Sequence, residues 1–166
     1  MFETTYPAVR YNGATVTETR RITLDAGSNL NKVEVFYRSD QSDRSDLSDQ
    51  TIAFAAGLVK RKNVAVSSDA ANGWAALWGP TNAKEENGLL GTGIVMPKGP
   101  FTGITEDNVH VLVRGKANFM TAATYYAGAC WTRSGDMTSS GEWNAYLNDF
   151  ALRLASPLKI ALQSVR

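Results

Sequence analysis

The sequence predicts an all-β fold, an antiparallel β-sandwich that carries one C-terminal α-helix. Turn-forming residues recur about every ten residues over the first two thirds of the chain, with alternating apolar and polar residues between them. Residues 139–155 break this rhythm, because their apolar side chains repeat with the period of a helix. With 166 residues, of which 43% are hydrophobic and 20% charged, residues 1–166 are predicted to form a single domain with its own core.

Period-two patterns between turn signals predict the strands one after another. The expected strands are residues 14–24, 32–38, 51–59, 63–67, 73–78, 89–96, 109–114 and 120–127. The turn cluster at 25–29 separates the first two strands, so we expect them to form an antiparallel pair joined by a loop. Segment 63–67 is expected either to continue strand 51–59 or to pair with it.

The predicted helix has both a clear apolar face and a clear start. Ser139 followed by Glu142 predicts a capping box, in which two backbone N–H groups at the start of the helix find acceptors. Pro157 ends the helix, and residues 158–165 are expected to form a last strand. The apolar face consists of Trp143, Tyr146, Leu147, Phe150, Ala151 and Leu154.

Residues 39–50 repeat a Ser-Asp-x triplet four times. Ser and Asp compete with the backbone for hydrogen bonds and carry little apolar surface, which favours a solvated loop. The alternative is a calcium site, but EF-hand loops place their carboxylates two residues apart and need a glycine at the turn. The triplet pattern offers neither feature, so we favour the loop and expect no metal.

Composition excludes several classes of function. Lys and Arg total 17 and Asp and Glu total 16, so a net charge of +1 gives no electrostatic basis for binding nucleic acid. No apolar run approaches the roughly 20 residues of a membrane helix, so membrane insertion is not expected. The lone Cys130 can form neither an internal disulfide nor a Cys/His zinc cluster. No dinucleotide or phosphate-binding motif is present, and we expect no cofactor.

Aromatic residues are the strongest hint of a binding surface. Trp74 and Trp78 lie on one expected strand, Tyr125 and Tyr126 on another, and Trp131 follows shortly after. Indole and phenol rings stack on sugars while their polar edges bind hydroxyl groups, so these residues could form a platform for carbohydrate. The alternative is that they are core residues. The polar candidates near them are Lys60, Arg133, Glu142, Glu18 and Arg20.

Three of these candidates, and the one histidine, can be given possible roles. An acidic sugar would need a cation such as Lys60 or Arg133 beside its carboxylate. Glu142 is fully explained as a helix cap. His110 lies within an expected strand, where a histidine is either structural or catalytic.

Three segments, 16–35, 56–60 and 125–131, together with the C-terminal pattern 143–159, resemble a bacterial family still named as a domain of unknown function. Its members are common in polysaccharide-utilisation gene clusters, and intact members look about twice as long as this chain. The resemblance implies a large β-sandwich of the sugar-mutarotase and polysaccharide-lyase kind, of which this chain would be the C-terminal part. The missing N-terminal half would then be a partner.

The resemblance also implies an activity, the elimination of water or alcohol from uronic-acid-containing oligosaccharides, as in an ulvan oligosaccharide dehydratase. Tyr125 or Tyr126 would transfer protons, Lys60 or Arg133 would neutralise the carboxylate, and His110 would assist. Substrate would contact Trp74, Trp78, Trp131 and Arg133.

One observation limits what this chain would do by itself. The family's His- and Asp-containing motif has no counterpart in it, so the 166 residues alone are expected to be inactive. A non-catalytic carbohydrate-binding domain and a purely structural half-domain are the alternatives.

The N-terminus shows no signal peptide, which fits the cytoplasm, whereas a longer family protein would be periplasmic or secreted.

Overall fold

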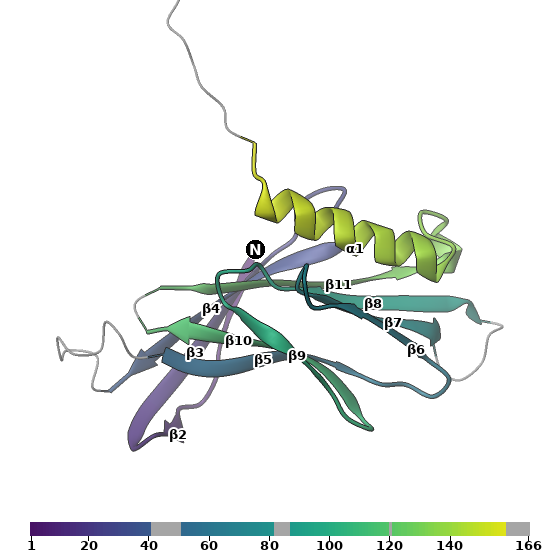
Figure 1. Cartoon of the computed structure of the whole chain (residues 1–166). Coiled ribbons are helices and arrows are strands. Elements are labelled where there is room, and N and C mark those ends of the chain that lie inside the picture. Colours follow the sequence, from purple (N-terminus) through teal and green to yellow (C-terminus); the bar gives the residue numbers. More distant parts are fainter. Residues whose placement is uncertain (41–50, 82–86, 120, 159–166) are drawn as a thin grey trace, which may run out of the picture.

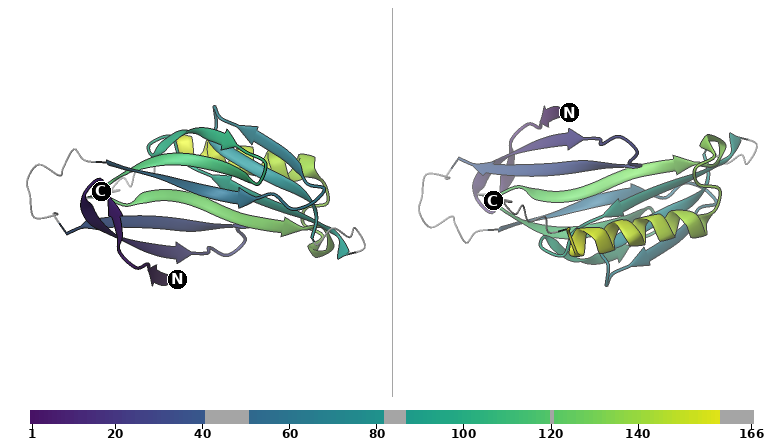
Figure 2. Two further views of the ribbon diagram at one scale, coloured as in Figure 1. Left: turned by 90° about the horizontal axis from the view of Figure 1, so that it is seen from below. Right: turned by 90° about the horizontal axis from the view of Figure 1, so that it is seen from above.

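The computed structural model describes residues 1–40, 51–81, 87–119 and 121–158. In this part of the chain two antiparallel sheets and one helix are stacked in three layers (Figure 1). The predicted all-β sandwich with a single C-terminal helix is confirmed. Figure 2 shows the helix lying across one face of the large sheet, while the small sheet covers part of the opposite face.

The large sheet has eight strands, all paired antiparallel to their neighbours. The order is β1 (Phe2–Thr5), β3 (Ala14–Thr23), β4 (Leu30–Ser39), β11 (Ala123–Trp131), β8 (Leu89–Val95), β7 (Trp74–Pro80) and β6 (Ala65–Asp69). Strand β2 (Val9–Tyr11) pairs with β3 beside β1. Strands β3 and β4 form the expected pair, joined by the loop at residues 24–29.

The prediction for segment 63–67 is wrong. Its strand, β6, pairs with β7 in the large sheet and neither continues nor pairs with strand 51–59. Asn63 has a φ of 59°, in the left-handed region, and this turn takes the chain out of one sheet and into the other.

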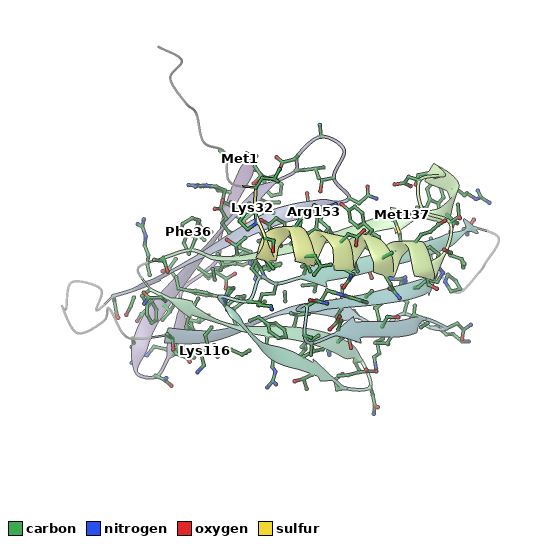
Figure 3. The ribbon with its side chains drawn as sticks, turned by 45° about the horizontal axis from the view of Figure 1, so that its top comes forward. Met1, Lys32, Phe36, Lys116, Met137 and Arg153 are labelled. Atoms are coloured by element: carbon green, nitrogen blue, oxygen red, sulfur yellow. The ribbon has the colours of Figure 1, made fainter. Side chains whose placement is uncertain are left out.

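The small sheet has three strands, β5 (Thr51–Val59), β10 (His110–Asn118) and β9 (Phe101–Glu106), with β10 in the centre. Its inner residues Ala56, Val111 and Val113 pack on Leu77 and Ile94 of the large sheet. Alternation therefore divides each strand into a core side and an outer side. In Figure 3, Lys32 and Phe36 lie on the helix side of the large sheet, and Lys116 on the outer side of the small one.

Helix α1 (Ser140–Ala155) covers the other face of the large sheet, after a short 3-10 turn, η3 (Thr132–Ser134). The capping box is confirmed: Ser139 Oγ accepts from the N–H of Glu142, and the Glu142 carboxylate accepts from the N–H of Ser139. Trp143 and Leu147 are fully buried against β8, where Gly91 and Gly93 leave room for them. Residues 159–165 of the expected last strand, and the triplet segment beyond Asp40, lie outside the described residues.

Candidate functional site

A groove opens between β5 and the inner face of the large sheet, on the side of β3 and β4. One hollow of about 390 Å³ has a floor of apolar side chains, among them Val16, Val35 and Ile52. A second hollow, of about 440 Å³, continues along β5 and shares Arg20 and Tyr125 with the first. The polar lining of the first hollow consists of Tyr6, Glu18, Arg20, Tyr37 and Tyr125.

Strand alternation brings these polar groups onto one surface. Glu18 and Arg20 are on the same side of β3 as the buried Val16, so they face inward. Register places Tyr37 opposite Glu18 on the neighbouring β4. Tyr125 comes from β11, the next strand across. Three adjacent strands therefore contribute a cation, a carboxylate and phenol hydroxyls to one groove.

A compact ion pair anchors the centre of the groove. The Nε of Arg20 donates to Oε1 of Glu18 at 2.5 Å, and the two side chains are 36% and 22% exposed. The guanidinium carbon of Arg20 also lies 4.6 Å from the centre of the Tyr6 ring, a cation–π contact. Because the guanidinium has five N–H donors, several remain to bind an incoming carboxylate.

The charges in the groove act on one another. Burial lowers the pKa of Arg20, but the phenol of Tyr125, the bond to Glu18 and the nearby Tyr6 outweigh it, and the pKa is raised. Burial, the charge of Glu18 and a hydrogen bond to Glu18 raise the pKa of Tyr37. Burial raises the pKa of Tyr125, against the opposing charge of Arg20. At neutral pH the guanidinium is therefore charged and both phenols keep their protons.

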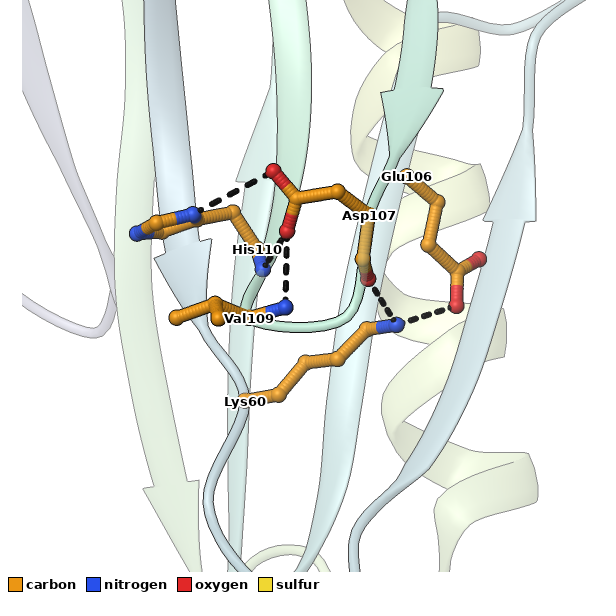
Figure 4. Close-up of polar contacts among 5 residues, drawn as sticks. All are labelled: Lys60, Glu106, Asp107, Val109 and His110. Atoms are coloured by element: carbon orange, nitrogen blue, oxygen red, sulfur yellow. Dashed lines mark hydrogen bonds and ion pairs between the residues drawn. The ribbon is translucent and has the colours of Figure 1, made fainter.

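Lys60 and His110 are placed elsewhere, in a network at the end of β5 and the turn between β9 and β10 (Figure 4). The Lys60 ammonium donates to Glu106 Oε1 at 2.5 Å and to the backbone oxygen of Asp107 at 2.6 Å. Asp107 Oδ1 accepts from the N–H groups of Val109 at 2.7 Å and His110 at 2.6 Å. His110 Nδ1 is 3.5 Å from Asp107 Oδ2. These contacts tie the two strand ends together, and neither Lys60 nor His110 lines the groove.

The two adjacent tyrosines point to opposite faces of the large sheet. Tyr125 lines the groove, with its ring centre 6.5 Å from that of Phe54 on β5. Tyr126 packs under α1, with its ring 4.8 Å from the Phe150 ring in an edge-on contact. Because successive side chains of a strand alternate, the pair cannot serve one site.

The tryptophans do not converge on the groove either. Trp74 is only 7% exposed and belongs, with Trp143, to the cluster beneath α1. Trp78 packs against the same cluster. Trp131 lies at the end of β11, 41% exposed, and its Nε1 donates to the backbone oxygen of Asn87 at 2.9 Å. The guanidinium carbon of Arg133 is 6.0 Å from the Trp131 ring.

Some members of the groove were not singled out by the sequence. Tyr6 and Tyr37 were not predicted, because nothing in the sequence places them beside β3 and β11. A usable signal was present in β3, where Glu18 and Arg20 share the side of Val16 and so interrupt a face that would otherwise be apolar. Charged residues on the core side of a strand point to a site rather than to a core.

The described residues contain no group of three or more His, Cys, Asp or Glu side chains arranged to hold a metal. None of the described helices is both long and apolar enough to cross a membrane. Cys130 is buried, and burial raises the pKa of its thiol to about 11.

Fold and site together define a class of protein: an antiparallel sandwich with a polar groove between its two sheets. Residues 1–160 match a family described as a domain of unknown function (DUF4861), and the chain belongs to that family. It is 26% identical over 160 residues to "Uncharacterized protein P7" of Formosa agariphila. That match covers 92% of this chain but 36% of the relative, so the chain spans about a third of the relative's length. No solved structure matches it significantly.

Proposed function

We propose that this domain belongs to a carbohydrate-active protein of polysaccharide degradation. The longer protein would act on uronic-acid-containing oligosaccharides by eliminating water or an alcohol. The observation that carries the proposal is the groove in which Arg20, Glu18 and Tyr125 meet above an apolar floor. A protein of this kind would work in the periplasm or outside the cell, where its polymer is found.

The groups in the groove match the three needs of the reaction. Elimination from a uronate removes the proton next to the carboxylate and expels an oxygen from the neighbouring carbon. Arg20 would bind the carboxylate and stabilise the enolate that forms as the C–H bond breaks. Glu18, the carboxylate in the lining of the first hollow, would take that proton. Tyr125, whose pKa is raised by burial, would give its proton to the departing oxygen.

This assignment differs from the roles that the family resemblance implies. Arg20 replaces Lys60 and Arg133 as the cation for the carboxylate, because Lys60 is held by Glu106 outside the groove. Tyr125 keeps its role in proton transfer, while Tyr126 is packed beneath the helix. The lining of the groove supports Arg20 and Tyr125 over the other candidates in this proposal.

The test uses the product of the complete reading frame and a set of uronic-acid oligosaccharides. Elimination creates an unsaturated uronate, whose ultraviolet absorbance is followed over time. Tyr125→Phe is expected to slow this signal by roughly 10²-fold or more, the usual contribution of a general acid. Tyr126→Phe is the matched control, since it makes the same chemical change on the opposite face and is expected to keep the rate.

A second pair of variants separates the two candidate cations. Arg20→Met is expected to abolish the signal, and Lys60→Met to keep it. The mechanism is refuted if Tyr125→Phe and Tyr126→Phe behave alike, or if Lys60→Met is the inactive variant. If no substrate of the set gives an absorbance change with the complete product, the elimination reaction itself is refuted.

The alternative is a non-catalytic carbohydrate-binding domain, and the exposed Trp131 beside Arg133 favours it. A sugar bound there would change tryptophan fluorescence in a saturable way, without any gain in absorbance. Trp131→Ala is expected to remove that response. If the response survives this substitution, Trp131 is not the binding surface.

A further inference from the structure

The outer edge of β5 is a free strand edge. On one side, β10 pairs with β5 in unbroken register, from Thr51 opposite Asn118 to Val59 opposite His110. On the other side, no strand among the described residues pairs with it. The three-stranded sheet therefore ends at β5, while the facing sheet continues through β4, β3 and β1.

The contacts show which backbone groups face outward. The N–H of Lys60 donates to the backbone oxygen of Val109. Every second residue of β5, counted back from Lys60, therefore directs its N–H to β10. The residues between them direct theirs away. Two bonds agree: Lys116, opposite Ala53, donates toward β9, and the N–H of Ala53 faces the Tyr11 hydroxyl at 3.5 Å. The outward groups belong to Ala53, Ala55, Gly57 and Val59. The N–H of Ala53 is bonded to Tyr11, and we call the other three residues, Ala55, Gly57 and Val59, the free edge.

The free edge has none of the usual protection against pairing. Natural sheets guard an exposed edge with charged residues, proline, a bulge or a very short strand. β5 has nine residues, with neither charge nor proline and no bulge against β10. The opposite edge is guarded: β9 ends in Glu106 and its register with β10 shifts at Arg114 and Gly115. An unguarded strand of this length indicates an edge that is covered in the working protein.

Space for another strand lies beside this edge. The two hollows of the groove follow β5 from Ile52 to Leu58 and leave the inner side of β3 and β4 only partly covered. A strand added next to β5 would extend the small sheet over this surface, as the second layer of a sandwich does. It would also form a wall of the groove.

We propose that the free edge pairs with a β-strand from the part of the longer protein that this chain lacks. The relative from Formosa agariphila has nearly two thirds of its length outside the match. In a protein of that length, another part of the same polypeptide could supply the strand. Recognition would come from the outward N–H and C=O groups, through an antiparallel or parallel ladder. The pairing does not depend on the proposed function of the groove.

Amide hydrogen exchange tests the pairing directly. It is measured on the 166-residue chain and on the product of the complete reading frame. In the short chain, the amides of Ala55, Gly57 and Val59 are expected to exchange fast, while those of Ala56 and Leu58, bonded to β10, are protected. In the longer product, the three outward amides are expected to exchange at least about 100-fold more slowly than in the short chain.

A proline substitution in β5 tests the same pairing through the urea midpoint of unfolding. Ala55→Pro removes an outward N–H and leaves the bonds to β10, so the short chain is expected to unfold at nearly its original urea concentration. In the longer product the same substitution is expected to lower the midpoint, because a ladder bond is lost. Ala55→Thr, which keeps the N–H, is the matched control in both proteins.

Three results would overturn the proposal. The first is a reading frame that encodes these 166 residues alone. The second is an equal effect of Ala55→Pro on the two proteins, or outward amides that exchange equally fast in both. The third is protection in the short chain that rises with its concentration, which would assign the edge to a second copy.

Discussion

Replacing Gly93 by alanine tests how α1 is seated on the large sheet. A Cβ at this position of β8 would lie 2.8 and 2.9 Å from the two methyl carbons of Leu147 and 3.0 Å from Cζ2 of Trp143. Both of those side chains are fully buried, so neither can turn into solvent to make room. The helix must shift, or the two side chains must leave their preferred rotamers.

The size of the effect follows from two opposing terms. Overpacking a well-filled core costs about 1–3 kcal/mol, and short contacts to two buried side chains favour the upper half of that range. Alanine also restricts the unfolded chain, which returns about 0.4–1 kcal/mol. The net loss is about 1–2.6 kcal/mol. For a chain of this size, each kcal/mol lowers the Tm by about 2–4 °C, so a fall of about 2–10 °C is expected.

Urea unfolding followed by tryptophan fluorescence measures this loss, because Trp143 changes from a buried to an exposed environment. Gly99→Ala is the matched control: a Cβ there meets nothing within 4 Å, so only the unfolded-chain term acts and the stability is expected to stay the same or rise by up to about 1 kcal/mol. In combination with Leu147→Ala, which empties the space that the methyl group needs, Gly93→Ala is expected to cost less than it does alone. Equal stabilities of Gly93→Ala and Gly99→Ala, or strictly additive effects with Leu147→Ala, would refute the packing argument.

Three further predictions concern the helix start and the buried thiol. Ser139→Ala removes the acceptor for the N–H of Glu142 and is expected to lower the free energy of unfolding by about 1 kcal/mol. Hydrogen bonds from the backbone and hydroxyl of Thr138 lower the pKa of Glu142, so its contribution is complete above the usual value of 4.5 and is lost as the pH falls through the lowered one. Unfolding curves from pH 7 to pH 3 should therefore fall less steeply for Glu142→Gln, and an unchanged slope would contradict this. Burial raises the pKa of Cys130 to about 11, so a thiol reagent is expected to react with it only in denaturant; fast reaction of the native protein would contradict the burial.

Regular alternation made most of the fold predictable. The long strands and the capped helix carry their periods openly, and the structure contains them close to the expected positions. The sequence did not reveal β1, β2 and β9. The first two have only four and three residues, too few for a period to stand out, and in the six residues of β9 Gly103 interrupts the alternation. The pairing of β6 was also missed, because it depends on the left-handed turn at Asn63 rather than on any pattern within the strand.

The site was less predictable, because sequence neighbours are not spatial neighbours. A platform of Trp74, Trp78 and Trp131 requires one shared face, but the helix covers the first two. Lys60 looked available as a cation, yet its ammonium is held by Glu106, a residue 46 positions away. The pairing of β5 with β10 and that of β10 with β9 together bring those two residues close, and no local pattern reports either pairing.

Stability alone does not explain the ion pair in the groove. Arg20 and Glu18 occupy positions on the core side of β3, in line with the buried Val16, where apolar side chains would pack without a desolvation cost. Burial does act against the charge of Arg20, and its neighbours must compensate for it. The half-buried Arg20–Glu18 pair therefore contributes little to stability, but it holds a charged guanidinium beside Tyr125. That combination is what recognition of an acidic ligand requires, and it is why the groove, rather than the exposed network around Lys60, carries the functional proposal.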